Sequence, residues 1–256
     1  MIEMPGMGFK GKVALVVGAS GGIGARTAQL FAQSGAKVVL AGRNMGALET
    51  VAAGIEGNAA LLKCVTCDVT DAASMERMVA DSVTHFGRID AAFNNAGWEG
   101  TAVDAADITE DDWAKMMDVK LSGVWRGLKY QIRQMLAQDG GGAIVNMAGN
   151  WGLVGFPQYA SYCAAAHGVM GLTRSSALEY AGRRIRINAV CPSAVDTPML
   201  ERMVGGNEAV KGHFAAAVPI GRLANADDVA QAVLWLCSGN ASYITGQGIV
   251  LTGGAQ

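Results

Sequence analysis

A glycine-rich loop directly follows the first apolar run of the chain, and no other feature constrains the fold as strongly. The run KVALVVG ends at Gly18, and the letters after it, ASGGIGARTA, put Gly22 and Gly24 at the start of a helical pattern. Glycines in such a turn let the backbone approach a pyrophosphate group, which the N-terminus of the helix stabilises. Because a second strand-like run, KVVLAG, follows that helix, we predict a nucleotide site at Gly18, Ser20, Gly22, Ile23 and Gly24.

Apolar β-rich runs alternate with helical patterns along the rest of the chain. These runs lack polar alternation, as strands buried on both faces of a parallel sheet do. Right-handed crossovers between them give helices on both sides of the sheet. We therefore predict an α/β fold in which residues 1–256 form a single-domain, doubly wound Rossmann fold with a parallel seven-stranded sheet. The seven predicted strands lie within 12–18, 37–42, 59–69, 89–97, 142–149, 184–192 and 248–254.

Helical patterns fill most of the intervening sequence. They are predicted at 22–35, 71–86, 111–136, 157–181 and 226–238. The stretch at about 198–220 follows the sixth strand and shows no regular pattern. Because ligands of such folds bind beyond the carboxyl ends of the strands, we expect this stretch to form a substrate lid.

Composition excludes several other classes of protein. The chain is 51% hydrophobic and 16% charged, with a net charge of −2, so it can bury a core and presents no basic surface for nucleic acid. No run of 18 apolar residues predicts a membrane span, and the first twelve residues are too polar for a signal peptide. Five cysteines, an odd number, favour a reducing cytoplasm. Cys64 and Cys67 could form a redox or metal pair, but we expect buried packing residues and no metal site.

The end of the second predicted strand bears on cofactor choice. An acidic residue there would bind the ribose hydroxyls of NAD, but Gly42 and Arg43 occupy the position. A small residue beside a guanidinium suits the additional 2′-phosphate of NADP. We therefore expect NADP(H) to be preferred over NAD(H), unless Arg43 is simply a solvated residue at a helix start.

Several longer motifs now carry a resemblance. GASGGIG, CDVTD, NNAG, GAIVNMAG, RINAVCP with VDTPM, GRLANADDVAQAVLWLCS and ITGQGIVLTGG stand in order along the chain. Together they make the chain similar to the short-chain dehydrogenase/reductase family over nearly its whole length. The resemblance implies an oxidoreductase that moves a hydride between a nicotinamide and a carbonyl or alcohol carbon, usually as a homotetramer. It also implies cofactor contacts from Asp68 and Val69 to adenine, from Asn95, Ala96 and Gly97 near the ribose, and from Tyr162, Val195 and Thr197 near the nicotinamide.

The catalytic residues of that family are only partly present. The tyrosine is Tyr162, but its serine partner, thirteen residues earlier, is replaced by Gly149. The lysine position, four residues after the tyrosine, holds Ala166, and the asparagine position on an earlier helix holds Lys120. A tyrosine has an ordinary pKa of about 10, so it needs a nearby cation to act as a base at neutral pH. Lys120 could supply that cation in the space left by Ala166, or it could point to solvent.

Other side chains are candidates for the remaining roles. Asn150 could donate a hydrogen bond in place of the serine. His167 lies about 100° round the helix from Ala166, and we expect it to pack outside the site. An apolar or aromatic substrate is expected from possible pocket walls at Trp98, Trp151, Phe156, Tyr159 and Met199.

Three functions remain open from these residues. The first is an NADP-dependent oxidoreductase with a rearranged proton relay. The second is a non-redox lyase, isomerase or cyclase that uses Tyr162 as acid or base. The third is a catalytically inactive cofactor-binding protein, or a mutated variant of an active enzyme. A fold alone does not choose among them.

Overall fold

The computed structural model describes residues 8–255, so the outermost ends of the predicted domain, 1–7 and 256, lie outside the described residues. The described chain forms a seven-stranded sheet in the order β3-β2-β1-β4-β5-β6-β7. Every neighbouring pair is parallel, which confirms the predicted doubly wound sheet. The strands are β1 (Val13–Val17), β2 (Lys37–Gly42), β3 (Leu62–Thr66), β4 (Ala91–Asn94), β5 (Gly142–Met147), β6 (Ile185–Pro192) and β7 (Gly248–Leu251).

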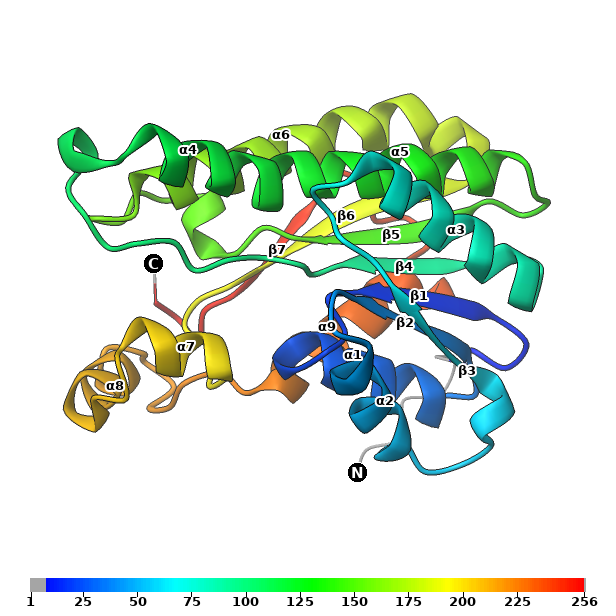
Figure 1. Ribbon diagram of the computed structural model, residues 1–256, viewed down its shortest axis with the longest axis horizontal. Coiled ribbons are helices and arrows are strands. Elements are labelled where there is room, and N and C mark those ends of the chain that lie inside the picture. Colours follow the sequence, from blue (N-terminus) through cyan, green and yellow to red (C-terminus); the bar gives the residue numbers. More distant parts are fainter. Residues whose placement is uncertain (1–7, 256) are drawn as a thin grey trace.

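Helices cover both faces of this sheet (Figure 1). On one face lie α1 (Gly22–Gln33), α2 (Met45–Ala53) and α9 (Ala226–Cys237). On the other lie α3 (Ala72–Phe86), α4 (Glu110–Met116), α5 (Gly123–Leu136) and α6 (Ala160–Tyr180). Short turns of helix complete the described elements: η1 (Ala59–Leu61), η2 (Ala105–Asp107), η4 (Asn150–Gly152), η5 (Ala181–Arg183) and η6 (Gly239–Ala241).

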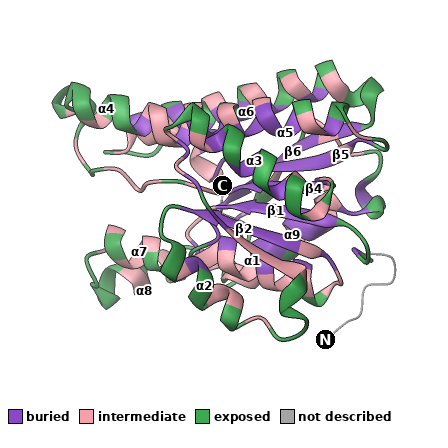
Figure 2. Cartoon of the chain, turned by 45° about the vertical axis from the view of Figure 1, so that its right-hand side comes forward, coloured by how far each residue is buried: buried purple, intermediate pink, exposed green. Residues whose placement is uncertain are grey.

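The strands are buried because both faces of the sheet carry a core. In β1, Val13, Leu15 and Val17 belong to the core under α3, α5 and α6. Ala14 and Val16, which alternate with them, belong to the core under α1 and α9. Figure 2 shows the inner strands as largely buried while the outer faces of the helices stay exposed. The edge strands β3 and β7 are only partly buried. This two-sided burial explains why the predicted strands lacked polar alternation.

Two regions that were not predicted as helices are helical. The stretch near 198–220 is not irregular, because it contains α7 (Pro198–Met203) and α8 (Glu208–Ala216). Pro198 starts α7, and the Asn207 side chain caps α8 by accepting hydrogen bonds from Ala209 and Val210. Helix α2 was not predicted, although the side chain of Asn44 caps it in the same way. Short helices of this kind depend on caps more than on a long apolar face.

The predicted helix at 111–136 is interrupted. A π-helical segment, η3 (Met117–Ser122), separates α4 from α5. In a π-turn the backbone hydrogen bonds span five residues, and such segments are frequent at functional sites. Lys120 is in this segment, so the local backbone sets the direction of its side chain.

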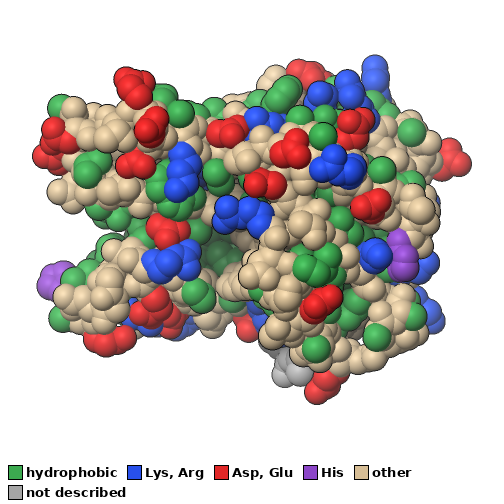
Figure 3. Space-filling view, viewed as in Figure 1, with side chains coloured by type: hydrophobic (Ala, Val, Ile, Leu, Met, Phe, Trp, Pro, Cys, Tyr) green, Lys and Arg blue, Asp and Glu red, His purple; other side chains and the backbone are tan. Residues whose placement is uncertain are grey.

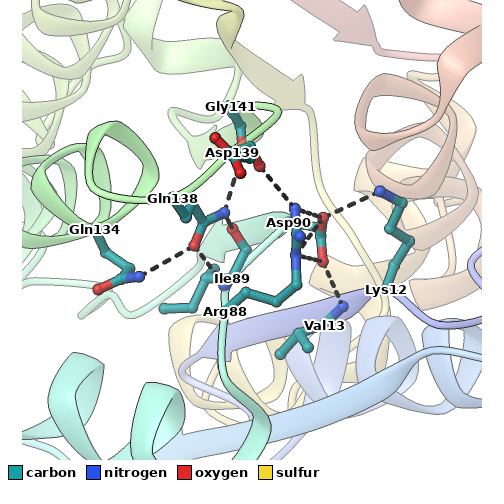
Figure 4. Close-up of polar contacts among 9 residues, drawn as sticks. All are labelled: Lys12, Val13, Arg88, Ile89, Asp90, Gln134, Gln138, Asp139 and Gly141. Carbon is teal, nitrogen blue, oxygen red and sulfur yellow. Dashed lines mark hydrogen bonds and ion pairs between the residues drawn. The ribbon is translucent and has the colours of Figure 1, made fainter.

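A polar network fastens the amino ends of the central strands (Figure 4). The Asp90 carboxylate accepts hydrogen bonds from Lys12 Nζ at 3.1 Å, from Arg88 Nε at 3.0 Å and from the backbone N–H of Val13 at 3.0 Å. Gln138 bonds the backbone of Ile89 through both ends of its amide. This edge of the sheet is therefore structural, and it lies opposite the glycine-rich loop.

The cysteines are all free thiols. Cys67 is buried with its Sγ 3.2 Å from the Sδ of Met75, and burial raises the pKa of this thiol to about 12. Cys64 is half-buried rather than buried, and it packs against the core under α1 and α9. No group of three or more His, Cys, Asp or Glu within residues 8–255 is arranged to hold a metal ion. Among these residues, none of the helices is both long and apolar enough for a membrane crossing.

Candidate active site

The glycine-rich loop between β1 and α1 leaves no room for side chains. A Cβ on Gly24 would lie 2.0 Å from the carbonyl oxygen of Gly18. A Cβ on Gly18 would lie 2.8 Å from the backbone nitrogen of Ala96, in the loop after β4. No side chain caps α1 at Gly21, so its first backbone N–H groups are left for a ligand. An uncapped helix N-terminus behind a close-packed glycine loop fits a pyrophosphate.

Loops from neighbouring strands meet around this turn. Asn95 Nδ2 donates to the Gly18 carbonyl at 3.1 Å, which fixes the loop after β4 against the glycine loop. A Cβ on Gly22 would lie 3.5 Å from the side chain of Thr197, in the loop after β6. The predicted cofactor residues therefore gather at the carboxyl edge of the sheet: Gly18, Ser20, Gly22, Ile23, Gly24, Arg43, Asp68, Val69, Asn95, Ala96, Gly97, Val195 and Thr197.

The end of β2 opens into a polar pocket. Ser20, Arg43 and Asn44 line it together with Met45 and Gly46. The backbone N–H of Thr70, and then its hydroxyl, hold the pKa of Asp68 below its ordinary value, and the Arg43 guanidinium acts in the same direction. A guanidinium and two neutral donors in an open pocket fit a phosphate group.

Lys120 is the most unusual residue at this edge of the sheet. Its side chain leaves the π-turn η3 inward and is only 2% exposed. Its Nζ lies 4.2 Å from the centroid of the Tyr162 ring. None of the ion pairs among residues 8–255 includes Lys120. Tyr162 is therefore the aromatic group against which this buried cation lies.

The two missing family side chains leave different kinds of space. Ala166 is fully buried, and a Cβ on Gly152 would lie 2.8 Å from the Ala166 carbonyl oxygen, so η4 and α6 are tightly packed there. Gly149 has a φ of 83° and a ψ of 160°. This is a region of backbone space that is nearly restricted to glycine. Asn150, the candidate replacement for the serine, follows it as a half-buried residue at the start of η4.

An aromatic cluster surrounds the tyrosine. Trp151 stacks on Phe156 at 4.3 Å between ring centroids, lies 4.8 Å from Tyr159, and meets Tyr162 edge-to-face at 5.2 Å. Burial, and then the Glu99 carboxylate, raise the pKa of the Tyr159 phenol. Tyr159 is thus held in its neutral form. Tyr162 is the tyrosine that has the Lys120 cation beside it.

Trp98 lies in the loop after β4, and Met199 of α7 reaches that loop. Lys115 of α4 has its Nζ 3.9 Å from the centroid of the Trp98 ring. A Cβ on Gly97 would lie 3.9 Å from Met199 Cε, so the start of α7 reaches this loop. Figure 3 shows the surface hollowed between the part that carries α4 and the segment of α7 and α8, with hydrophobic side chains in the hollow. His167, as expected, is exposed, and its Nδ1 lies 2.9 Å from the Cys163 carbonyl oxygen.

An ion pair that the sequence patterns did not predict joins the two sides of this hollow. Arg202 of α7 donates to Glu99, after β4, from Nε at 2.5 Å and from Nη2 at 3.1 Å. These hydrogen bonds hold the pKa of Glu99 below its ordinary value. Lys211 of α8 pairs with Asp196 at 2.8 Å and also bonds Glu201. We call these contacts the lid clasp; its main partners are 103 residues apart in sequence, and no local pattern signals such a pair.

Comparisons with known proteins agree with this geometry. A sequence profile described as Enoyl-(Acyl carrier protein) reductase matches residues 18–256. Cyclohexanol dehydrogenase from Acinetobacter sp. (strain SE19) is 41% identical over 248 residues, covering 96% of this chain and 95% of the relative. The 2,5-dichloro-2,5-cyclohexadiene-1,4-diol dehydrogenase of Sphingobium indicum is 37% identical over 246 residues, covering 96% and 97%. Both are dehydrogenases of alcohols.

Solved structures give the same picture. The crystal structure of levodione reductase matches with a TM-score of 0.91 at 35% identity, covering 96% of this chain and 98% of that one. The 3-ketoacyl-(acyl-carrier-protein) reductase from Brucella melitensis, complexed with NADH, matches at 0.89 and 32%, covering 96% and 98%. A point variant of actinorhodin polyketide ketoreductase with NADPH matches at 0.90 and 33%, covering 95% and 96%. Similar chains thus bind either nicotinamide cofactor.

Proposed function

The chain belongs to the short-chain dehydrogenase/reductase family, and on that basis we propose that it is an NADP(H)-dependent oxidoreductase that interconverts an alcohol and a carbonyl compound. In this proposal Tyr162 moves the proton. Lys120 supplies the positive charge that the family lysine supplies elsewhere, and Asn150 holds the substrate oxygen in place of the serine.

The position of Lys120 carries the proposal. Its ammonium is buried, has no carboxylate partner among the described residues, and lies 4.2 Å from the centroid of the Tyr162 ring. A positive charge at this range stabilises a phenolate relative to a phenol. An unpaired buried cation is costly to the fold, so a functional use accounts for it better than packing does.

The proton step follows from these positions. When bound, the nicotinamide cofactor would donate or accept the hydride at the carbon that bears the oxygen. In reduction the Tyr162 hydroxyl donates its proton to the carbonyl oxygen, and Lys120 stabilises the phenolate that is left. In oxidation the phenolate accepts the proton of the alcohol. The aromatic cluster excludes water from one side of the tyrosine, which strengthens the effect of the charge.

The cofactor preference rests on the pocket at the end of β2. Arg43 and Ser20 line it, and no acidic side chain is among its lining residues. A guanidinium there would bind the 2′-phosphate of NADP(H), whereas NAD(H) offers only a hydroxyl. We therefore propose NADP(H) as the cofactor.

A ring-bearing, apolar substrate fits the walls of the hollow. Trp151, Tyr159, Trp98 and Met199 offer flat or flexible apolar surface near the tyrosine. Pockets lined in this way, with few polar groups, bind apolar ligands that one or two hydrogen bonds orient. The names of the two dehydrogenase relatives also specify six-membered carbon rings. We propose a cyclic secondary alcohol or its ketone as the substrate class.

A direct assay tests the proposal. Purified protein is given NADPH with cyclohexanone, or NADP+ with cyclohexanol, and cofactor absorbance is followed. The open-chain ketone 2-hexanone serves as the matched substrate, and the Tyr162→Phe variant as the matched protein. We expect turnover of the ring ketone at a higher kcat/KM than 2-hexanone, and none with Tyr162→Phe. Tight cofactor binding without turnover of any alcohol or ketone would instead favour a non-redox or inactive protein.

A further inference from the structure

The hydroxyl of Tyr162 fits against a residue that has no side chain. A Cβ built on Gly149 would lie 3.3 Å from Tyr162 Oη and 3.9 Å from its Cε1. The first of these distances is tighter than ordinary van der Waals contact between a carbon atom and its neighbours. A side chain at position 149 would therefore require the phenol oxygen to move by a few tenths of an ångström.

The backbone conformation at position 149 independently favours glycine. Its φ of 83° with a ψ of 160° is a conformation that residues with a Cβ rarely adopt. Three hydrogen bonds hold this conformation. The N–H groups of Ala148 and Gly149 both donate to the Val190 carbonyl, at 3.1 and 3.2 Å, and the Gly149 carbonyl accepts from Gly152 at 3.0 Å. A backbone fixed between β6 and η4 in this way cannot turn to accommodate a side chain without breaking these bonds.

We propose that Gly149 is a positioning residue, whose bare Cα seats the Tyr162 hydroxyl while Lys120 lies over the ring. This inference rests on the proposed function only in taking Tyr162 as the group that moves the proton. It changes the meaning of the missing serine. Position 149 is therefore more than a site that lacks the family serine, because a serine placed there would displace the Tyr162 hydroxyl.

We call the contact between Gly149 and the Tyr162 hydroxyl the seat. A second contact beside it fixes the Tyr162 ring. Trp151, two residues after Gly149, meets Tyr162 edge-to-face. The ring is thus held by a cation, by an aromatic edge and by the glycine. A displacement of the hydroxyl at one of these contacts alters its distance from the others, so a small change at position 149 is expected to reach the proton step.

A double-mutant cycle on stability tests the seat without any catalytic assay. Gly149→Ala is made in the wild-type chain and in the Tyr162→Phe chain, which lacks the hydroxyl. We expect Gly149→Ala to lower the Tm by several degrees in the wild type and by at least about 2 °C less in the Tyr162→Phe background. The backbone strain is the same in both backgrounds and cancels. An equal loss in both would overturn the proposal.

Gly221 supplies a matched control. It has the same φ of 83°, but a Cβ there would meet nothing within 4 Å. Gly221→Ala should therefore lower the Tm equally in the two backgrounds, since only backbone strain is involved. If Gly149→Ala alone does not fold, the combined Gly149→Ala and Tyr162→Phe chain should. Failure of the combined chain to fold would also overturn the seat.

Kinetics then separate positioning from a merely structural role. Gly149→Ser and Gly149→Ala should each lower kcat at least tenfold while the cofactor Kd stays within about twofold, because a Cβ at this position would meet Tyr162 within 4 Å and no atom of the glycine-rich loop. Gly149→Ser, which restores the family serine, is the decisive variant: a kcat equal to or above that of the wild type would contradict the proposal. A wild-type protein without oxidoreductase activity would refute the proposed function, and the stability cycle would still decide the seat.

Discussion

The ammonium of Lys120 lies 4.2 Å from the centroid of the Tyr162 ring, and these two residues come from different helical segments on the same side of the sheet. The π-turn η3 directs the lysine inward, and α6 carries the tyrosine. In the family pattern both groups stand on one helix, four residues apart. Here the second group of the pair is supplied by a neighbouring segment, which retains a charge beside the phenol although position 166 is alanine.

Arg43 should govern cofactor choice. Replacing it with Ala removes a charged hydrogen-bond donor from the phosphate pocket, a contact worth about 1.5–3 kcal/mol. NADP(H) affinity should fall by roughly ten- to a hundredfold, while NAD(H) affinity changes little. Calorimetric titration of both cofactors measures this, with the exposed Arg77→Ala as the control. Equal affinities of the wild type for both cofactors, or a preference for NAD(H), would refute it.

The lid clasp should hold α7 over the hollow. Glu99 is 16% exposed and Arg202 is 57% exposed, so the pair is partly screened and its removal should have a moderate effect. Glu99→Gln should speed hydrogen exchange in α7 and lower kcat/KM by a few-fold. Glu208→Gln, on the outer helix α8, is the control. Unchanged exchange in α7 would show that other contacts hold it.

The same clasp should be sensitive to acid. The pKa of Glu99 is lowered on folding by its hydrogen bonds from Arg202. A group with a lowered pKa stabilises the fold above its unfolded value, about 4.3 for Glu, and loses that contribution as the pH falls through the folded value. The clasp should therefore be complete at neutral pH, weaken once the pH falls below the unfolded value, and be lost as the pH passes through the lower folded pKa of Glu99. Exchange in α7 that is equally slow at acid and neutral pH would contradict this.

Asp90 should be a stability residue without catalytic effect. Its carboxylate is 10% exposed and accepts hydrogen bonds from two basic side chains and one backbone N–H, at the edge of the sheet opposite the glycine-rich loop. Asp90→Asn should cost about 1–3 kcal/mol of unfolding free energy, because charge-assisted bonds are lost in a partly buried place. Thermal or denaturant unfolding measures it, with kcat expected to be unchanged. Asp81→Asn, on the exposed side of α3, is the control.

The chain should form a homo-oligomer, expected to be a tetramer. Trp125 of α5 is 48% exposed and Leu178 of α6 is 85% exposed. Large apolar side chains that are exposed on neighbouring helices favour association. Light scattering at micromolar concentration tests the prediction. Leu178→Glu should weaken the assembly, whereas a charge reversal on the opposite helix α2, Glu49→Lys, should not. A monomeric wild type would refute it.

The fold was largely predictable from the sequence for a simple reason. Strands buried on both faces carry continuous apolar runs, so β1 and β6 stand out without any knowledge of their neighbours. Helix α2 was harder, since nine residues with one buried side chain give almost no periodic signal. The placement of helices on both faces of the sheet then followed from the handedness of the crossovers.

The site was less predictable because it depends on contacts between distant segments. The inward direction of Lys120 depends on a π-turn that no composition indicates. The pairing of Glu99 with Arg202 joins positions that only the folded chain brings together. The glycine at position 149 was visible as a departure from the family, but its positive φ and its contact with Tyr162 were not.

The pH dependence of kcat/KM in the Lys120→Asn variant tests the central claim most directly. If Lys120 stabilises the phenolate of Tyr162, the variant should lose about one to two orders of magnitude in turnover at neutral pH, and its pH–rate profile should move upward. Adding Ala166→Lys should recover part of the loss by restoring the family arrangement. An unmoved profile, with Tyr162→Phe still inactive, would contradict the account: the tyrosine would then work without a nearby cation.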